Sequence, residues 1–270
     1  GLHWALVRTS IASGMRETLL ETSRNLNAFD LSRDGRMLTA SATDEQEDIY
    51  VGNVDGTELR RLTNDIYKDR QPVFSPDSKF IYFYSDRGGR YEIWRILPDG
   101  SGLTQVTRLQ GDNVSSARIS PDGTRLAVAS GSRGCGIVDL SGDIPVTEVE
   151  WPELPVEGQR FVFQTWSPDG RKLLAADPEG NTWYYDLDRK EWGAARNVPV
   201  LPSQATWLGP DQLLTVSDGS FVAANPWTGE VRSLDIETPT EGFRFGCSAD
   251  GQWIYAIEWY QESNIWMLDF

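Results

Sequence analysis

The chain has 270 residues, of which 40 are acidic and 25 basic, and its formal net charge is −15. It is long enough to bury a packed core, and 39% of it is hydrophobic, so a disordered chain is excluded. No apolar run approaches the roughly 18 residues of a membrane-spanning helix, and the negative charge argues against nucleic acid as a ligand.

The first predicted elements are two strands near the N-terminus. Residues 5–11, a turn at 12–14 and residues 16–22 have the pattern of a strand, a turn and a second strand. They resemble the third and fourth strands of the units that follow.

From residue 32 onward a four-residue turn recurs, with 39 to 47 residues between neighbouring copies. A period of roughly 40–45 residues is typical of a four-stranded propeller blade. The six copies are SRDG at 32–35, SPDS at 75–78, SPDG at 120–123, SPDG at 167–170, GPDQ at 209–212 and SADG at 248–251.

Proline and glycine favour the backbone angles of this turn, and its aspartate can bond the neighbouring main chain. We therefore assign its aspartates a structural role. They are Asp34, Asp77, Asp122, Asp169, Asp211 and Asp250.

Strand patterns stand on both sides of each turn, and further strands follow it. Third strands are expected at 48–54, 91–97, 136–140, 182–187, 220–225 and 264–270. Fourth strands are expected at 58–63, 102–107, 146–150, 191–198 and 230–235.

The sequence predicts one all-β domain over residues 1–270, a six-bladed β-propeller of four-stranded antiparallel blades. The sixth unit lacks a fourth strand, so we expect a strand at about 16–22 to close the ring by pairing with 264–270. Residues 5–11 would then be an extra outer strand or the remnant of an upstream unit. The expected blades are 23–64, 65–108, 109–150, 151–200, 201–236, and 237–270 plus 1–22.

Residues 62–107, with LTND, DRQPVFSPDSKFIYFYSDRGGRYEIW and LPDGSGLTQVT, resemble the TolB-type propeller repeat, a WD-like repeat of bacterial proteins. ISPDGTRLAVAS and WSPDGRKLLAA repeat its core. The resemblance implies a periplasmic or extracytoplasmic location and a protein partner, since TolB docks a peptidoglycan-associated lipoprotein. Similar repeats occur in sensor regions of regulators and beside serine peptidase domains. The separate N-terminal α/β domain of TolB proper has no counterpart, because residues 1–27 are too few.

Histidine-based catalysis is not expected, because His3 is the only histidine. A Ser-His-Asp triad with a mid-chain histidine and a metal site of several imidazoles are both excluded. A glycoside hydrolase built on carboxylates and arginines needs no histidine and is our third hypothesis, although the Asp-box typical of sialidases is absent.

No cofactor is expected, although the central channel leaves room for a cation such as calcium. No loop has the twelve-residue calcium pattern with its central glycine. Cys135 and Cys247 are interpreted as buried thiols, with a disulfide between them left open.

Recognition of a partner is the function that we favour. We expect a monomeric, non-enzymatic platform for a protein or peptide; the alternative is a sensor module of a larger regulator that binds a small ligand or glycan. Arginine and aromatic side chains in the loops would form the contacts. The candidates are Tyr67, Arg90, Tyr91, Trp151, Trp259 and Tyr260. Arg87 and Asp69 are instead expected to be structural, and the acidic run at 44–48 to be a solvated loop.

Overall fold

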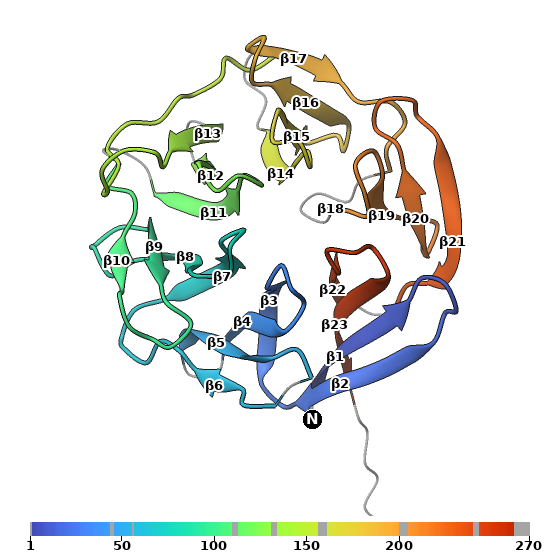
Figure 1. The fold of residues 1–270 in the computed structure, drawn as a ribbon, viewed down its shortest axis with the longest axis horizontal. Coiled ribbons are helices and arrows are strands. Elements are labelled where there is room, and N and C mark those ends of the chain that lie inside the picture. The colour runs from blue at the N-terminus through green and yellow to red at the C-terminus, as the bar shows by residue number, and fades with distance from the viewer. Residues whose placement is uncertain are drawn as a thin grey trace, which may run out of the picture.

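The computed structural model is a closed ring of six antiparallel sheets, arranged like the blades of a propeller (Figure 1). It describes residues 2–43, 46–55, 57–109, 113–130, 134–155, 161–199, 205–239 and 243–261. The predicted all-β, six-bladed propeller is confirmed, and these ranges contain no helix. Accordingly, the described part of the chain has no helix that is long and apolar enough to cross a membrane.

In every blade the first strand lies nearest the central axis, and the later strands lie progressively outward (Figure 1). Blade 1 has β3 (Asn25–Leu31), β4 (Met37–Thr43), β5 (Glu47–Asn53) and β6 (Arg60–Arg61); blade 2 has β7 (Asp69–Phe74), β8 (Ile81–Ser85), β9 (Glu92–Ile96) and β10 (Thr104–Gln105). Blade 3 has β11 (Val114–Ile119), β12 (Arg125–Ser130) and β13 (Gly134–Asp139); blade 4 has β14 (Val162–Trp166), β15 (Lys172–Ala176), β16 (Thr182–Asp186) and β17 (Glu191–Ala194). Blade 5 has β18 (Thr206–Trp207), β19 (Leu213–Ser217), β20 (Ser220–Ala224) and β21 (Val231–Glu237); blade 6 has β22 (Phe243–Cys247), β23 (Trp253–Gln261), β1 (Leu2–Ser10) and β2 (Arg16–Thr22).

The recurring turn joins the first and second strands of a blade and fixes their register. In blade 2, Ser75 Oγ donates to Asp77 Oδ1 over 2.6 Å and accepts the Phe80 N–H over 2.9 Å. Equivalent serine-to-aspartate hydrogen bonds occur at Ser32, Ser120, Ser167 and Ser248. Side-chain bonds of this kind replace main-chain partners inside a tight turn, so one local motif builds five of the six inner hairpins.

The N-terminal strands close the ring, as expected, but the expected pairing of residues 16–22 with 264–270 is wrong, because 16–22 pair with β1. β1 lies between β23 and β2, so Trp4 pairs with Trp259 on one side and with Thr22 on the other. Residues 5–11 therefore belong mainly to the third strand of blade 6 and are not surplus, while 16–22 form its fourth strand. Residues 264–270 lie outside the described residues. β1 lies inside the blade because four consecutive apolar residues, Trp4 to Val7, are all buried on its two faces, and Leu6 has no exposed surface.

Blade 3 has the least regular outer edge. Its described residues form a three-stranded sheet, and 146–150, expected as a fourth strand, forms only isolated bridges. Ile137 and Glu150 exchange both main-chain hydrogen bonds, whereas Val146 pairs with Thr107 of blade 2. This segment therefore links two blades.

The core lies between adjacent blades. For example, Ile49 and Val51 of β5 pack in one cluster with Ile81 and Phe83 of β8, and none of the four is more than 3% exposed. Burial on both faces of each sheet holds the blades rigidly around the axis. The side chains on the first strands consequently have fixed positions.

Candidate functional site in the central channel

The first strands of all six blades line a cavity of about 880 Å³ on the axis of the ring. Its wall includes residues of β3, β7, β11, β14, β18 and β22. Ligand sites in proteins typically measure about 300–1,000 Å³. The channel is therefore the candidate site.

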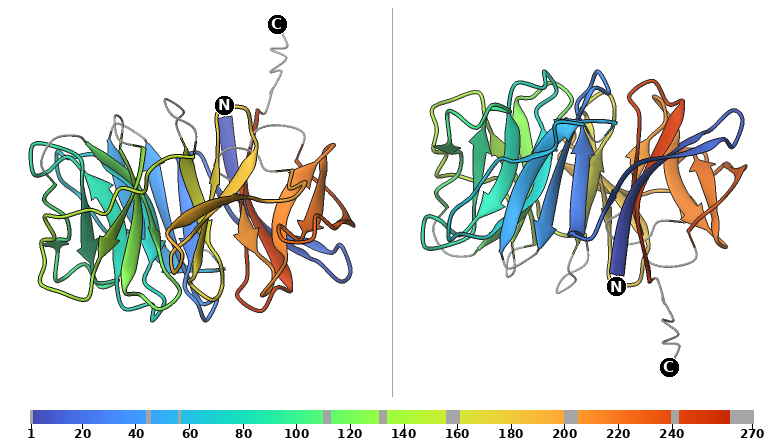
Figure 2. Two further views of the ribbon diagram at one scale, coloured as in Figure 1. Left: turned by 90° about the horizontal axis from the view of Figure 1, so that it is seen from above. Right: turned by 90° about the horizontal axis from the view of Figure 1, so that it is seen from below.

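Different loops surround the two ends of the channel, as the edge-on views in Figure 2 show. One end, here called the turn face, carries the recurring turns and the β1–β2 hairpin. The other end, the loop face, carries the hairpins between second and third strands and the connections between blades. The segments at 62–68 and 86–91 belong to the loop face.

Arginines outnumber carboxylates in the described channel wall. The charged residues there are Arg33, Arg70, Arg118, Arg244, Asp30 and Glu47. Arg70 and Glu47 neutralise each other, because Nη2 donates to Oε1 over 2.8 Å and Nε donates to the second carboxylate oxygen. Three arginines then face one carboxylate, so the wall is positive within a protein whose net charge is −15.

Asp30 and Arg118 join neighbouring blades across the channel wall. Asp30 Oδ2 accepts the Phe74 N–H over 2.7 Å, and Arg118 Nε donates to the main-chain oxygen of Gln164 over 3.0 Å. Enclosure by the wall raises the pKa of Asp30 to about 6, although the Phe74 N–H and the charge of Arg118 oppose this shift. Asp30 is thus a carboxyl group that titrates near neutral pH.

β-Bulges interrupt four of the first strands, and the residues at three of them line the channel, Ser116 being the exception. Their registers shift at Asn27, between Arg70 and Val73, at Ser116 and at Gln164. A bulge leaves a residue out of the ladder and redirects its side chain. Each bulge therefore frees a polar residue from the regular alternation of its strand.

Three polar side chains that line the cavity hold buried atoms without a hydrogen-bond partner among the described residues. They are both amide atoms of Gln164, which is 2% exposed, Oε1 of Gln71 and Nε1 of Trp207. Buried polar atoms are nearly always paired in folded proteins, so these groups need a partner that the chain does not supply, either ordered water or a ligand. The wall thus offers unused donors and acceptors together.

The sequence interpretation missed these channel residues, although one signal was available. The second residue before the turn serine is Asp30, Val73, Arg118, Thr165 or Gly246, and all five line the cavity. Its chemistry varies between copies, whereas the residue after it is hydrophobic in every one. A position whose chemistry varies between copies of a repeat is not required by the fold and is free to serve a site. The bulge at Gln164 leaves no such signal.

Tyr67, Arg90 and Tyr91 all lie on the loop face, as their positions in the repeat imply. Tyr67 is half-buried, and its ring lies 5.5 Å from the guanidinium carbon of Arg87. Tyr91 packs edge-on against Tyr84 with ring centroids 5.4 Å apart. Arg90 is exposed. Tyr91 thus supports its loop, and Arg90 offers the most accessible side chain of the three.

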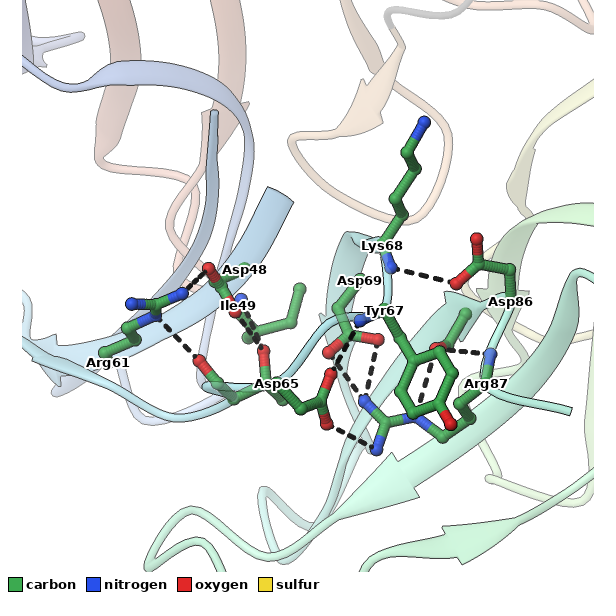
Figure 3. Close-up of polar contacts among 11 residues, drawn as sticks. Asp48, Ile49, Arg61, Asp65, Tyr67, Lys68, Asp69, Asp86 and Arg87 are labelled. Atoms are coloured by element: carbon green, nitrogen blue, oxygen red, sulfur yellow. Dashed lines mark hydrogen bonds and ion pairs between the residues drawn. The ribbon is translucent and has the colours of Figure 1, made fainter. Parts of the chain in front are cut away.

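Arg87 forms the centre of the polar cluster in Figure 3. Its Nη2 donates to both carboxylate oxygens of Asp69 over 2.8 and 2.7 Å, and its Nη1 lies 3.1 Å from Asp65. Asp69 is fully buried. Because the pair joins the start of β7 to the hairpin that follows β8, it positions the loops beside the channel mouth.

Trp151 and Trp259 pack against the body of the propeller. The Trp151 ring lies so close to Gly136 that a Cβ there would approach it to 2.8 Å. Trp259 contacts Trp4 across the ring closure with centroids 4.9 Å apart. Tyr260 lies on β23, opposite His3 of β1.

Within the described ranges, five of the six turn aspartates, all but Asp211, and both thiols have local hydrogen-bond partners. Hydrogen bonds from Ser32, Ser75, Ser120 and Ser248 are the main cause that lowers the pKa values of Asp34, Asp77, Asp122 and Asp250. Both cysteines are free, and burial raises the pKa of Cys135 to about 12 and that of Cys247 to about 11. Among the described residues, no group of three metal-ligating side chains could hold a metal ion.

The fold and the channel define a six-bladed β-propeller with a polar axial site. The family model of the TolB beta propeller domain matches residues 5–174, and the chain belongs to this family.

Curated relatives agree with this assignment. The chain is 29% identical over 199 residues to a TolB homologue of Chlorobium luteolum, covering 70% of this chain and 42% of that protein. It is 32% identical over 112 residues to the Tol-Pal system protein TolB of Helicobacter hepaticus (41% and 26%), and 28% identical over 126 residues to dipeptidyl-peptidase 5 of Porphyromonas endodontalis (44% and 18%). The chain thus covers less than half the length of these relatives.

Solved structures share the fold at low sequence identity. A protein assigned as TolB from Agrobacterium tumefaciens has a TM-score of 0.71 at 15% identity, covering 97% of this chain and all of that one. TolB from Acinetobacter baumannii has 0.61 at 16% (94% and 63%), and an oligogalacturonate lyase from Vibrio parahaemolyticus has 0.59 at 10% (93% and 95%). At these identities the likeness concerns the fold alone.

Proposed function

We propose that this TolB-type propeller binds a partner protein or peptide at the loop face and channel mouth, and that it works outside the cytoplasm without catalysing a reaction. The channel carries the proposal: all six blades contribute to a cavity of about 880 Å³ whose wall holds unpaired polar atoms. Relatives named TolB, one of them a Tol-Pal system protein, support both the partner class and the location.

The loop face also carries accessible side chains suited to a protein contact. Ile66, in the connection from β6 to β7, is 82% exposed, and Arg90 is exposed on the β8–β9 hairpin. Exposed apolar and arginine side chains around a rigid opening are common anchors for a partner. The acidic surface would steer a basic partner toward the protein.

The test compares two exposed apolar residues on opposite faces. The immobilised protein is exposed to envelope extract of its source organism, the stoichiometric partner is identified and purified, and its Kd is measured for each variant. Ile66→Asp on the loop face should weaken binding at least about tenfold, whereas Met15→Asp on the turn face, where Met15 is 58% exposed, should leave it unchanged. Equal effects of the two substitutions would overturn the proposed face.

A carboxylate-based hydrolase receives less support from the channel wall. Glu47 is held by Arg70, and Asp30 accepts a main-chain N–H, so both carboxylates already have hydrogen-bond partners. Incubation with aryl glycosides would test this alternative, and turnover that is lost in Asp30→Asn would favour it over a binding role.

A further inference from the structure

We propose that the channel recognises a carboxylate with a neighbouring amide, the chemistry shared by the C-terminal residue of a peptide and by a free N-acyl amino acid. The inference rests on the proposed function and specifies which part of a partner enters the channel. Its carboxylate would pair with Arg118, and its amide would pair with the side chain of Gln164.

The charge of the wall selects an anion over a cation. Arg70 and Glu47 neutralise each other. The remaining charged residues of the described cavity wall are three arginines, Arg33, Arg118 and Arg244, and one carboxylate, Asp30. A guanidinium inside a narrow, largely protein-lined channel attracts an anion more strongly than it would at an open surface. A negative ligand is therefore favoured there despite the net charge of −15.

Arg118 lines the cavity with its guanidinium held by main-chain oxygens. Its Nε donates to the Gln164 main-chain oxygen and its Nη1 to the Ala117 main-chain oxygen, both over 3.0 Å. Within the described residues no hydrogen bond involves Nη2, which is left for a ligand. Because two other nitrogens are anchored, the guanidinium is already fixed, and less conformational entropy is lost on binding.

The amide partner follows from the side chains that lack hydrogen bonds. Gln164 presents an unused acceptor and an unused donor on one carboxamide, and a secondary amide offers the matching donor and acceptor. Gln71 Oε1 adds an acceptor and Trp207 Nε1 a donor in the same wall. Gln164 is also hydrogen-bonded through its main chain to Arg118, so the carboxylate and amide positions are adjacent.

A structural role alone does not explain Gln164. Its side chain has no partner in the part of the chain that the structure describes, so it weakens the fold unless channel water or a ligand satisfies it. Gln164→Leu should accordingly leave stability unchanged or raise it, while it weakens ligand binding at least about tenfold. Gln105 on the outer strand β10 is the matched control, because its Nε2 donates to Thr107 over 2.9 Å. Gln105→Leu should lower stability and leave binding unchanged.

The probes are N-acetyl-trialanine with a free carboxylate, the same peptide with a C-terminal carboxamide, N-acetylalanine and D-glucuronate. Trp166 and Trp207 line the cavity, so their fluorescence reports occupancy. The acid should bind at least about tenfold more tightly than its amide in the wild-type protein, and this ratio should shrink in Arg118→Lys. If N-acetylalanine binds as tightly as the tripeptide acid, the natural ligand is a free small acid. If the tripeptide acid binds clearly more tightly, the natural ligand is the C-terminus of a chain. Both results support recognition of a carboxylate with a neighbouring amide.

Three results would overturn the inference: equal binding of acid and amide, unchanged binding in Gln164→Leu, or tighter binding of glucuronate, which has hydroxyls in place of the amide. The two proposals fail separately. If the purified partner still depends on Ile66 but acid and amide bind equally, the channel chemistry is wrong and the binding platform stands. If the acid binds more tightly than the amide but Ile66→Asp leaves the Kd of the partner unchanged, the proposed binding face is wrong and the channel site is supported.

Discussion

Replacing Asp30 with asparagine should stabilise the protein at alkaline pH and have little effect at acidic pH. The pKa of Asp30 is raised from 3.8 to about 6 in the folded protein, so the folded state binds this proton more tightly than the unfolded state. Stability from this group is therefore gained as pH falls from about 6 to about 4, and ionised Asp30 opposes folding above pH 6. Arg118 is the charged group that faces it.

The size of the effect follows from the shift of about two pKa units. At about 1.4 kcal/mol per unit, ionised Asp30 costs at most about 3 kcal/mol at pH 8. Channel water screens part of this, so we expect Asp30→Asn to gain about 1–2 kcal/mol at pH 8 and about zero at pH 4. The asparagine oxygen can still accept the Phe74 N–H, and Arg118 keeps its main-chain hydrogen bonds.

Urea unfolding followed by tryptophan fluorescence at the two pH values measures the difference. The difference in unfolding free energy between the variant and the wild-type protein at each pH isolates the contribution of Asp30 from that of other titrating groups. Asp34→Asn is the control of opposite sign. Hydrogen bonds from the Ser32 hydroxyl and the Arg36 N–H hold the pKa of Asp34 below its usual value, so its stabilisation is present at pH 8 and is lost on acidification. An Asp30→Asn protein that is less stable at pH 8, or equally affected at both pH values, would refute the reasoning.

Three further predictions concern the fold. Asp69→Ala should destabilise the protein by about 3–5 kcal/mol in urea unfolding, because it leaves the buried Arg87 without its main carboxylate. Asp188→Ala, in an exposed ion pair, should change stability by less than about 1 kcal/mol. Similar losses of stability in the two variants would contradict the prediction. Leu6→Ala should cost about 2–5 kcal/mol by the same measurement if β1 closes the ring, and loss of under 1 kcal/mol would argue against that closure. Cys135 is buried and Cys247 is half-buried, and both thiols have raised pKa values. Neither should therefore react quickly with a disulfide reagent at pH 8 in the folded protein, whereas both should react in denaturant. Rapid reaction of the native protein would refute the raised pKa values.

The blade architecture was predictable because the residues that determine each hairpin lie close together in the sequence. A serine, an aspartate and a tight turn within four residues make their hydrogen bonds to one another, whatever the rest of the chain does. The alternation of apolar side chains beside each turn predicted the strands. The loop-face positions of Tyr67, Arg90 and Tyr91 also follow from strand order, because the hairpins between second and third strands and the connections between blades lie at the same end of the ring.

Ring closure and the chemistry of the channel required the tertiary structure. The pairing of β1 with β23 joins segments far apart in the sequence, which no local pattern encodes. Arg118 and Gln164 meet although 46 residues separate them, and the bulge at Gln164 interrupts the alternation that a sequence reading relies on. Local turn chemistry thus determined the blades, whereas contacts between blades decided which polar groups face the axis and which remain unpaired.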